Sequence, residues 1–325
     1  MTVLITGAAG FIGSHLAKSL IALGHECILI DRISDYYSQD LKRSRFAELV
    51  GNQNKILFEI DLANRESLEK INPSNVSVVI HLAAQPGVRI KFPNNSTYLR
   101  DNISGHANIL DWTLRNNIPK FIYASSSSVY DLSKNSIFAE SEELCSPRNI
   151  YARSKFQNEK ISELYSEISN TEILGLRFFS VYGPWGRPDM AYFRIIAAAL
   201  TGNTFTLNGD GDIRRDFTYI GDVIESLARI CLLKKFQYST LNIGGGNDRT
   251  LLEVISIIEN LSGAKLKISK AGRDSMDLLR TKADTNRLES SIGTIPQTSI
   301  EIGLKTTLDW AMRKDIFPKL DLWKI

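Results

Sequence analysis

Tyr151 and Lys155 stand four positions apart in a stretch whose pattern predicts a helix, Tyr151-Ala-Arg-Ser-Lys155. Two side chains at this spacing lie on the same face of a helix, one turn apart. A tyrosine hydroxyl has an ordinary pKa of about 10, and a neighbouring ammonium lowers that pKa because it favours the phenolate. The pair could therefore supply a general base near neutral pH. The spacing alone is weak evidence, since many helices carry it on their surface.

A run of serines before this pair strengthens the catalytic interpretation. Ser125 to Ser128, followed by Val-Tyr130, stand at the end of a predicted strand over 120–125. A hydroxyl at a strand end can hydrogen-bond both a substrate oxygen and the tyrosine. Serine, tyrosine and lysine in this arrangement favour catalysis over a solvated helix face.

A glycine-rich turn near the start of the chain indicates a nucleotide site. The segment Gly7-Ala-Ala-Gly10-Phe-Ile-Gly13 follows a short β run and opens a helical pattern. Glycines there let the backbone turn tightly and approach a pyrophosphate, which rests on the helix N-terminus. Such a motif can also be an ordinary strand-to-helix turn, but its position between a strand and a helix favours a dinucleotide.

Acidic residues after the next strands indicate which dinucleotide is bound. Asp31 ends the second predicted strand, where a carboxylate can accept hydrogen bonds from ribose hydroxyls and would repel a 2′-phosphate. The sequence therefore predicts NAD, whose positively charged nicotinamide would further favour a tyrosine phenolate. Arg32 is an opposing signal, since an arginine beside this site can bind the 2′-phosphate of NADP. Asp61 and Leu62, after the third strand, could reach the adenine, or Asp61 could cap a helix starting near Asn64.

Alternating strands and helices predict the fold that positions these residues. Parallel strands with helices on both faces, joined by right-handed crossovers, form a Rossmann-type doubly wound α/β sheet. After about residue 180, loops rich in glycine, proline and asparagine separate shorter elements. We predict an NAD-binding domain over 1–180 and a smaller α/β substrate lobe over 181–325, with excursions back to the first domain. The predicted strands are 3–6, 27–31, 55–60, 76–81, 120–125 and 172–177.

The composition narrows the class of protein. The chain has 325 residues, 43% hydrophobic and 23% charged, as in ordinary soluble globular proteins. A net charge of +3 is too small to indicate nucleic-acid binding. No apolar run approaches the roughly 20 residues of a membrane span, and the first residues predict a strand rather than a signal peptide. Cys27, Cys145 and Cys231 are expected to be reduced thiols in the cytoplasm, and the scattered histidines predict no metal site.

Five segments of the chain follow the pattern of one enzyme class. They are Asp35-Tyr-Tyr-Ser-Gln-Asp-Leu-Lys42, Leu82-Ala-Ala-Gln-Pro-Gly-Val-Arg89, Ser125-Ser-Ser-Ser-Val-Tyr130, Val181-Tyr-Gly-Pro-Trp-Gly-Arg-Pro-Asp-Met190 and, for the wider class, Arg214-Arg-Asp-Phe-Thr-Tyr219. With these segments the whole chain resembles the extended short-chain dehydrogenases that act on nucleotide sugars, most closely the UDP-glucuronate 4-epimerases. The resemblance implies a Rossmann domain with NAD, a lobe that holds a UDP-sugar, and a homodimer paired through two helices from each subunit. It also implies inversion at C4 of the sugar, which would convert UDP-glucuronate to UDP-galacturonate through a transient 4-keto sugar.

The resemblance also assigns roles to individual positions. Its catalytic positions are Ser126, Tyr151 and Lys155, with Ser127 and Ser128 as the next choices for the serine. Cofactor contacts are implied for Gly7, Gly10, Phe11, Ile12, Gly13, Asp31, Asp61, Leu62, Leu82, Ala83, Ala84, Tyr151, Lys155 and Phe178. Substrate contacts are implied for Arg89, Ser127, Ser128, Ser180, Arg187, Arg215, Arg273 and Asp277. The chain departs from the family pattern at Arg32, at 90–93 and at Asp131.

Several alternatives stay open at this point. The substrate could be another UDP-hexose or an N-acetylhexosamine. A nucleotide-sugar dehydratase or decarboxylase is disfavoured, because those enzymes carry acidic residues just after the catalytic hydroxyl, where this chain has Ser127 and Ser128. A non-catalytic NAD-binding regulator is disfavoured because such a protein has no use for the general base.

Overall fold

The computed structural model describes residues 1–51, 57–87, 96–130, 137–142, 144, 147, 149–272 and 280–320. Its largest element is a seven-stranded sheet in which every neighbouring pair is parallel, in the order β10-β6-β5-β4-β1-β2-β3. The strands are β1 (Thr2–Thr6), β2 (Glu26–Asp31), β3 (Leu57–Glu59), β4 (Val76–His81), β5 (Lys120–Ser126), β6 (Glu172–Phe178) and β10 (Thr240–Ile243). This arrangement confirms the predicted doubly wound fold.

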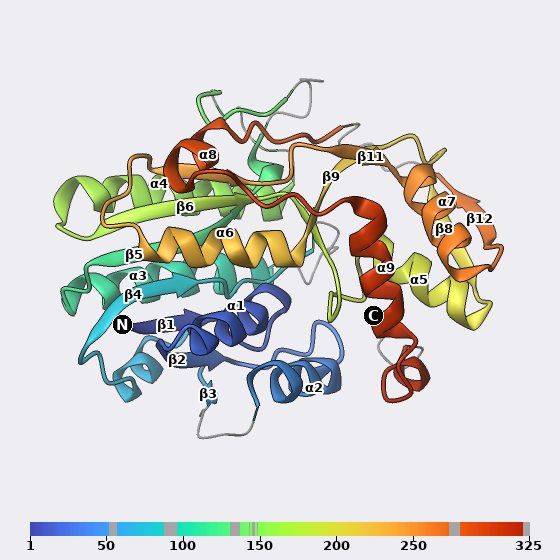
Figure 1. The fold of residues 1–325 in the computed structure, drawn as a ribbon. Coiled ribbons are helices and arrows are strands. Elements are labelled where there is room, and N and C mark those ends of the chain that lie inside the picture. Colours follow the sequence, from blue (N-terminus) through green and yellow to red (C-terminus); the bar gives the residue numbers. More distant parts are fainter. Residues whose placement is uncertain are drawn as a thin grey trace.

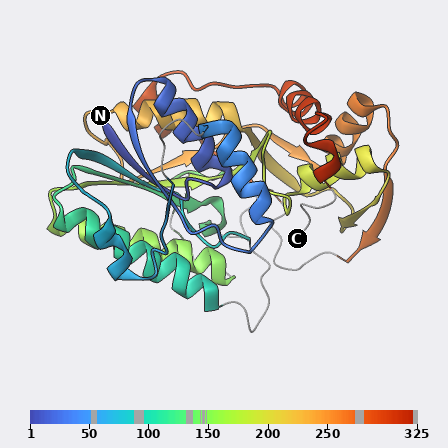
Figure 2. The ribbon, with the colours of Figure 1, turned by 90° about the horizontal axis from the view of Figure 1, so that it is seen from below.

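The strand residues form two hydrophobic cores because successive side chains point to opposite faces of the sheet. Val3 and Ile5 of β1 pack in one core, while Leu4 packs in the other. Figure 2 shows the sheet between two helix layers, one blue and gold and the other teal and green. The first layer consists of α1 (Phe11–Ala22), α2 (Gln39–Val50) and α6 (Ile220–Leu232), and the second of α3 (Gly105–Arg115) and α4 (Ile150–Ile168).

A second group of elements lies beyond the carboxyl ends of the large sheet (Figure 1). It has its own core, in which Tyr192, Val254 and Leu304 are buried. Its elements are β7 (Ser180–Tyr182), α5 (Ala191–Thr201), β8 (Thr204–Asn208), β9 (Arg214–Tyr219), β11 (Asp248–Thr250), α7 (Leu251–Ser262), β12 (Lys267–Ala271) and α9 (Ile300–Ala311). Strand β9 lies between β11 and β7 in one small sheet, and β12 pairs with β8 in another.

Part of the second half of the chain returns to the large sheet. Strand β10 extends that sheet beside β6, and α8 (Asn286–Ile292) packs on α6 and β10. The division at residue 180, with excursions back to the first domain, stays a prediction. Short helical turns complete the described chain: η1 (Arg65–Lys70), the π-helix η2 (Tyr98–Ser104), η3 (Ser127–Val129) and η4 (Phe317–Lys319).

Three properties follow from the described parts of the chain. None of their helices is both long and apolar enough to cross a membrane. Within the same ranges no three histidine, cysteine or acidic side chains come together as metal ligands would. Among the described residues Cys27 and Cys231 form no disulfide, whereas Cys145 lies outside these ranges.

Candidate active site

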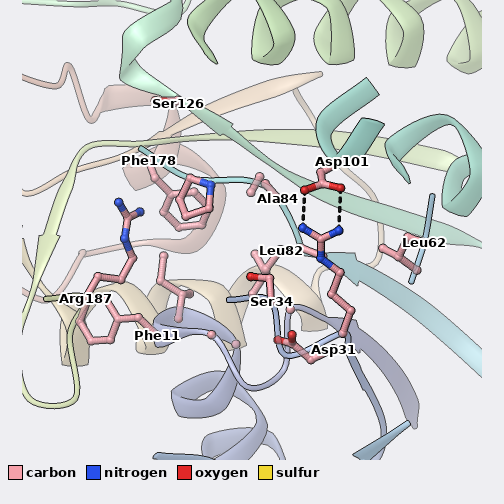
Figure 3. A pocket seen from close by; sticks show the side chains of 18 of the residues that line it. Phe11, Asp31, Ser34, Leu62, Leu82, Ala84, Asp101, Ser126, Phe178 and Arg187 are labelled. Carbon is pink, nitrogen blue, oxygen red and sulfur yellow. Dashed lines mark hydrogen bonds and ion pairs between the residues drawn. The ribbon is translucent and has the colours of Figure 1, made fainter. Parts of the chain in front are cut away.

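Two cavities meet beside the N-terminus of α4. The first lies at the carboxyl ends of β1, β2 and β4, where the strand order reverses and where ligands of doubly wound sheets bind. The second runs from that point toward α5, β8 and β9 of the smaller group. The side chains that line both are Ser126, Tyr151, Phe178, Phe179, Arg187 and Met190. Phe178, Ser126 and Arg187 appear together in Figure 3.

The glycine turn forms the floor of the first cavity. Gly7 has φ +71°, and a Cβ on it would lie 2.8 Å from the amide nitrogen of Ala83. A Cβ on Gly13 would lie 2.1 Å from the carbonyl oxygen of Gly7, so a side chain at either position would force the backbone apart. No side chain caps α1 at Gly10. The first N–H groups of this helix therefore stay available for an anion.

The acidic residues after β2 and β3 line the other end of this cavity. The Asp31 carboxylate accepts N–H groups from Ala9 and Ile33, at 3.0 and 2.8 Å. Asp61 accepts the N–H of Ala63 at 3.0 Å and pairs with Arg100. The cap of the following turn η1 comes instead from Asn64, whose side chain accepts the N–H of Glu66. The cap interpretation of Asp61 is therefore wrong for the helical turn.

Every residue predicted to contact the cofactor lines the first cavity. Long gaps in the sequence separate them, but they follow the carboxyl ends of parallel strands, which share one edge of the sheet. They are Gly7, Gly10, Phe11, Ile12, Gly13, Asp31, Asp61, Leu62, Leu82, Ala83, Ala84, Tyr151, Lys155 and Phe178.

The candidate general base stands on the first turn of α4. Asn149 caps this helix by accepting the N–H of Ala152 at 2.8 Å, which presents Tyr151 to both cavities. Lys155 is buried one turn later and donates to the carbonyl of Ala124 at 3.0 Å. Burial lowers the pKa of Lys155 to about 8.

The pKa of Tyr151 differs from the expectation based on its spacing from Lys155. Burial raises this pKa, while a hydrogen bond with Ser126 and the charge of Arg187 oppose the rise. The protein alone therefore favours the neutral phenol, because desolvation outweighs these neighbouring groups. The further positive charge of an oxidised nicotinamide acts in the direction needed for a base.

A buried ion pair behind the serines was not predicted. Glu159 of α4 accepts two hydrogen bonds from Arg177 of β6, at 2.9 and 2.8 Å, and a third from Ser125 of β5 at 2.5 Å. Arg177 also donates to the hydroxyl of Tyr130 at 3.0 Å. These contacts fix α4 against the strand end that carries Ser126. The sequence contains a signal for Glu159, because this residue lies one turn after Lys155 on the same helix face.

Arg45 is a second residue that the sequence did not single out. It is fully buried on α2 and donates to the carbonyls of Ala9 (2.9 Å), Trp185 (2.7 Å) and Gly186 (3.2 Å). It thereby joins the glycine turn to the loop that carries Arg187. In the sequence, the burial of Arg45 is indicated locally by its position one helical turn after Leu41, which is also buried.

The structure describes five of the eight predicted substrate residues, and all five line the second cavity: Ser127, Ser128, Ser180, Arg187 and Arg215. Arg89, Arg273 and Asp277 lie outside the described residues, as do Asp131 and 90–93. Arg187 donates its Nε to Asp189 at 2.9 Å and its Nη2 to the other oxygen of that carboxylate. A guanidinium has five N–H donors, so the pair with Asp189 leaves donors for a ligand.

Comparison with known proteins identifies the family. The model of the NAD dependent epimerase/dehydratase family matches residues 3–244, which is more than half of the chain. The chain belongs to the NAD-dependent epimerase/dehydratase family. The site described above therefore belongs to an NAD-dependent enzyme of this family.

Several known proteins resemble the chain over almost its full length. Protein CapI of Staphylococcus aureus is 38% identical over 330 residues, covering 95% of this chain and 98% of that protein. A UDP-glucuronate 4-epimerase of Thermodesulfobacterium geofontis is 36% identical, covering 95% of each. The structure of UDP-glucuronic acid 4-epimerase from Bacillus cereus in complex with UDP-glucuronic acid and NAD is 32% identical, with a TM-score of 0.88 and coverage of 95% and 98%.

Proposed function

We propose that the chain catalyses NAD-dependent C4 epimerisation of a UDP-sugar, interconverting UDP-glucuronate and UDP-galacturonate. The observation that carries this proposal is the junction of the two cavities, where Ser126, Tyr151 and Arg187 come together. The first cavity suits a dinucleotide, and the second opens from its reactive end. Relatives of known activity support the choice of sugar, since a UDP-glucuronate 4-epimerase is 36% identical to the chain.

The residues at the junction have separate roles in this proposal. Tyr151 accepts the proton of the C4 hydroxyl and later returns it, and Ser126 hydrogen-bonds the same sugar oxygen. Bound NAD supplies the acceptor and donor of hydride. Lys155, with its pKa near 8, is mainly protonated at neutral pH and keeps a positive charge one turn from Tyr151.

Epimerisation also requires the transient 4-keto sugar to turn over between the two hydride transfers. The second cavity has a volume of about 700 Å³, within the range of about 300–1,000 Å³ usual for small-molecule sites. Arg215 lines it and could bind the UDP phosphates, because a guanidinium matches phosphate geometry. Anchoring the nucleotide there would leave the sugar free to rotate.

Arg187 is the residue that we assign to the sugar carboxylate. It lines both cavities and its side chain is only 24% exposed, so it is not an ordinary surface arginine. The 4-keto form of a hexuronate is a β-keto acid, which loses CO₂ when its carboxylate bond aligns with the carbonyl π system. A carboxylate held by Arg187 could be kept out of that alignment.

A substrate panel tests the function directly. Incubation with UDP-glucuronate is expected to give UDP-galacturonate with no external oxidant, whereas UDP-glucose and UDP-N-acetylglucosamine react much more slowly. Chromatographic separation of the products measures this. Equal rates on neutral sugars would favour another UDP-hexose epimerase. Loss of water or CO₂ as the main reaction would favour a dehydratase or decarboxylase, and no turnover with NAD bound would favour a regulator.

The cytoplasmic homodimer implied by the resemblance is also part of the proposal. Leu164 and Ile168 are 63% and 79% exposed one turn apart on α4, and Leu99 of the adjacent η2 is 61% exposed. Large apolar side chains on neighbouring helices suit a contact with a second subunit. Sedimentation is expected to give a dimer that Leu164→Glu with Ile168→Glu dissociates. A wild-type protein that sediments as a monomer at micromolar concentration contradicts the dimer.

A further inference from the structure

Asp31 and Arg32 give opposite signals about the cofactor although they are neighbours in sequence. A carboxylate at the end of β2 favours NAD, whereas an arginine close to it favours the 2′-phosphate of NADP. Both side chains line the first cavity. The sequence alone leaves the effect of Arg32 undecided.

The contacts of Arg32 show how the conflict is resolved. Its Nη1 and Nη2 donate to the two carboxylate oxygens of Asp101, at 2.9 and 2.5 Å. Asp101 belongs to η2, its side chain is only 8% exposed, and it also lines the cavity. Figure 3 shows Asp101 above Asp31, and its dashed lines mark the two hydrogen bonds that the Asp101 carboxylate accepts from the guanidinium. The pair thus joins the end of β2 to η2.

Three further charged groups lie near this pair. Arg100 donates to Asp101 at 2.9 Å and pairs with Asp61, and Asp61 lies 3.6 Å from Arg32. Lys42 also lines the cavity, but its ammonium donates to the carbonyl and the hydroxyl of Ser34. Arg32 is therefore the guanidinium beside Asp31 that could turn to a 2′-phosphate if its partner were removed.

We infer that Asp101 is a specificity-determining residue, which makes the chain prefer NAD by binding Arg32 in a two-pronged ion pair. A phosphate could recruit Arg32 only by breaking this pair, which would leave the largely buried carboxylate of Asp101 with Arg100 as its remaining ion-pair partner. Breaking one partner from such a pair is costly. The inference does not depend on which sugar is the substrate.

The test compares the wild type, Asp101→Asn, Arg32→Ser and the double variant. The dinucleotide released when each purified protein is denatured is identified, and the ratio of the Kd values of NADP and NAD is measured after removal of bound cofactor. The wild type is expected to release NAD in near-equimolar amount. Asp101→Asn frees the guanidinium of Arg32 to bind the 2′-phosphate through a charge-assisted hydrogen bond. The preference of this variant for NAD is therefore expected to fall by about tenfold or more. Arg32→Ser is expected to keep the wild-type preference.

The double variant distinguishes this role from a general effect on the cavity. In the Arg32→Ser background, Asp101→Asn is expected to change the ratio by less than about twofold. Asp111→Asn is the matched control, because Asp111 pairs with Arg65 at 2.8 Å on the surface of α3. The inference is overturned if Asp101→Asn leaves the ratio of the Kd values unchanged. It is also overturned if Asp101→Asn lowers the preference for NAD equally in the Arg32→Ser background. A weaker affinity for NADP in Arg32→Ser than in the wild type also overturns the inference. This measurement tests the inference even if Asp101→Asn fails to fold.

Discussion

Tyr151→Phe is expected to lower the turnover of UDP-glucuronate by a factor of about 10² to 10⁴, the usual contribution of general acid–base catalysis. The change removes one oxygen and keeps the ring, so the packing around the two cavities is preserved. The loss of the hydrogen bond with Ser126 should cost only about 1 kcal/mol of stability. Turnover is measured by product separation, and folding by thermal unfolding with the NAD content.

The pH profile of the same variant separates a base from a packing residue. Burial raises the pKa of Tyr151, so its phenol is mainly neutral at low pH and the wild-type rate rises with pH as the phenolate forms. Tyr151→Phe has no such group, and its residual rate is expected to lose this rise. Tyr238→Phe is the matched control, because its hydroxyl bonds Ser290 at 3.3 Å on the surface. Near-wild-type turnover in Tyr151→Phe would make the assignment of the base wrong.

Local sequence signals predicted the residues whose chemistry follows from a strand end or a helix face. The turn Gly7–Gly13 and the carboxylate of Asp31 are each fixed by the strand beside them, and Tyr151 and Lys155 by the period of one helix. Because parallel strands present their carboxyl ends at one edge, these separate signals could be assembled into one site. The fold class followed from the same alternation of strands and helices.

Long-range packing was beyond the reach of such patterns. Arg45 is held by carbonyls near residues 9 and 185, and no periodicity relates such distant positions. The return of β10 to the large sheet is likewise a pairing between segments far apart. The pKa of Tyr151 was expected to fall because Lys155 is visible in the sequence, whereas the desolvation that raises it depends on the packing of the whole site.

The role of Arg187 is the prediction that decides the substrate. Arg187→Ala is expected to lower kcat/KM for UDP-glucuronate roughly 10- to 150-fold, which corresponds to about 1.5–3 kcal/mol for a charged hydrogen-bonded contact. A neutral sugar cannot use a two-pronged contact with a guanidinium, so the slower reaction of UDP-glucose should change little. Release of the carboxylate from its fixed orientation should also increase the side reaction in which the 4-keto sugar loses CO₂ and a UDP-pentose is formed.

The effect of Arg187→Ala also includes the loss of its ion pair with Asp189, and a second substitution at Asp189 separates the two effects. Arg187 donates to both oxygens of Asp189, whose side chain is only 14% exposed, so Arg187→Ala alone leaves a negative charge that would repel the sugar carboxylate. Adding Asp189→Asn removes that charge and is expected to restore part, but not all, of the lost activity on the acidic sugar. Arg229→Ala, on the outer face of α6 and paired with Glu225, should affect neither sugar. If wild type uses both sugars equally, or Arg187→Ala slows both alike, the better assignment is a C4 epimerase of neutral or N-acetylated sugars.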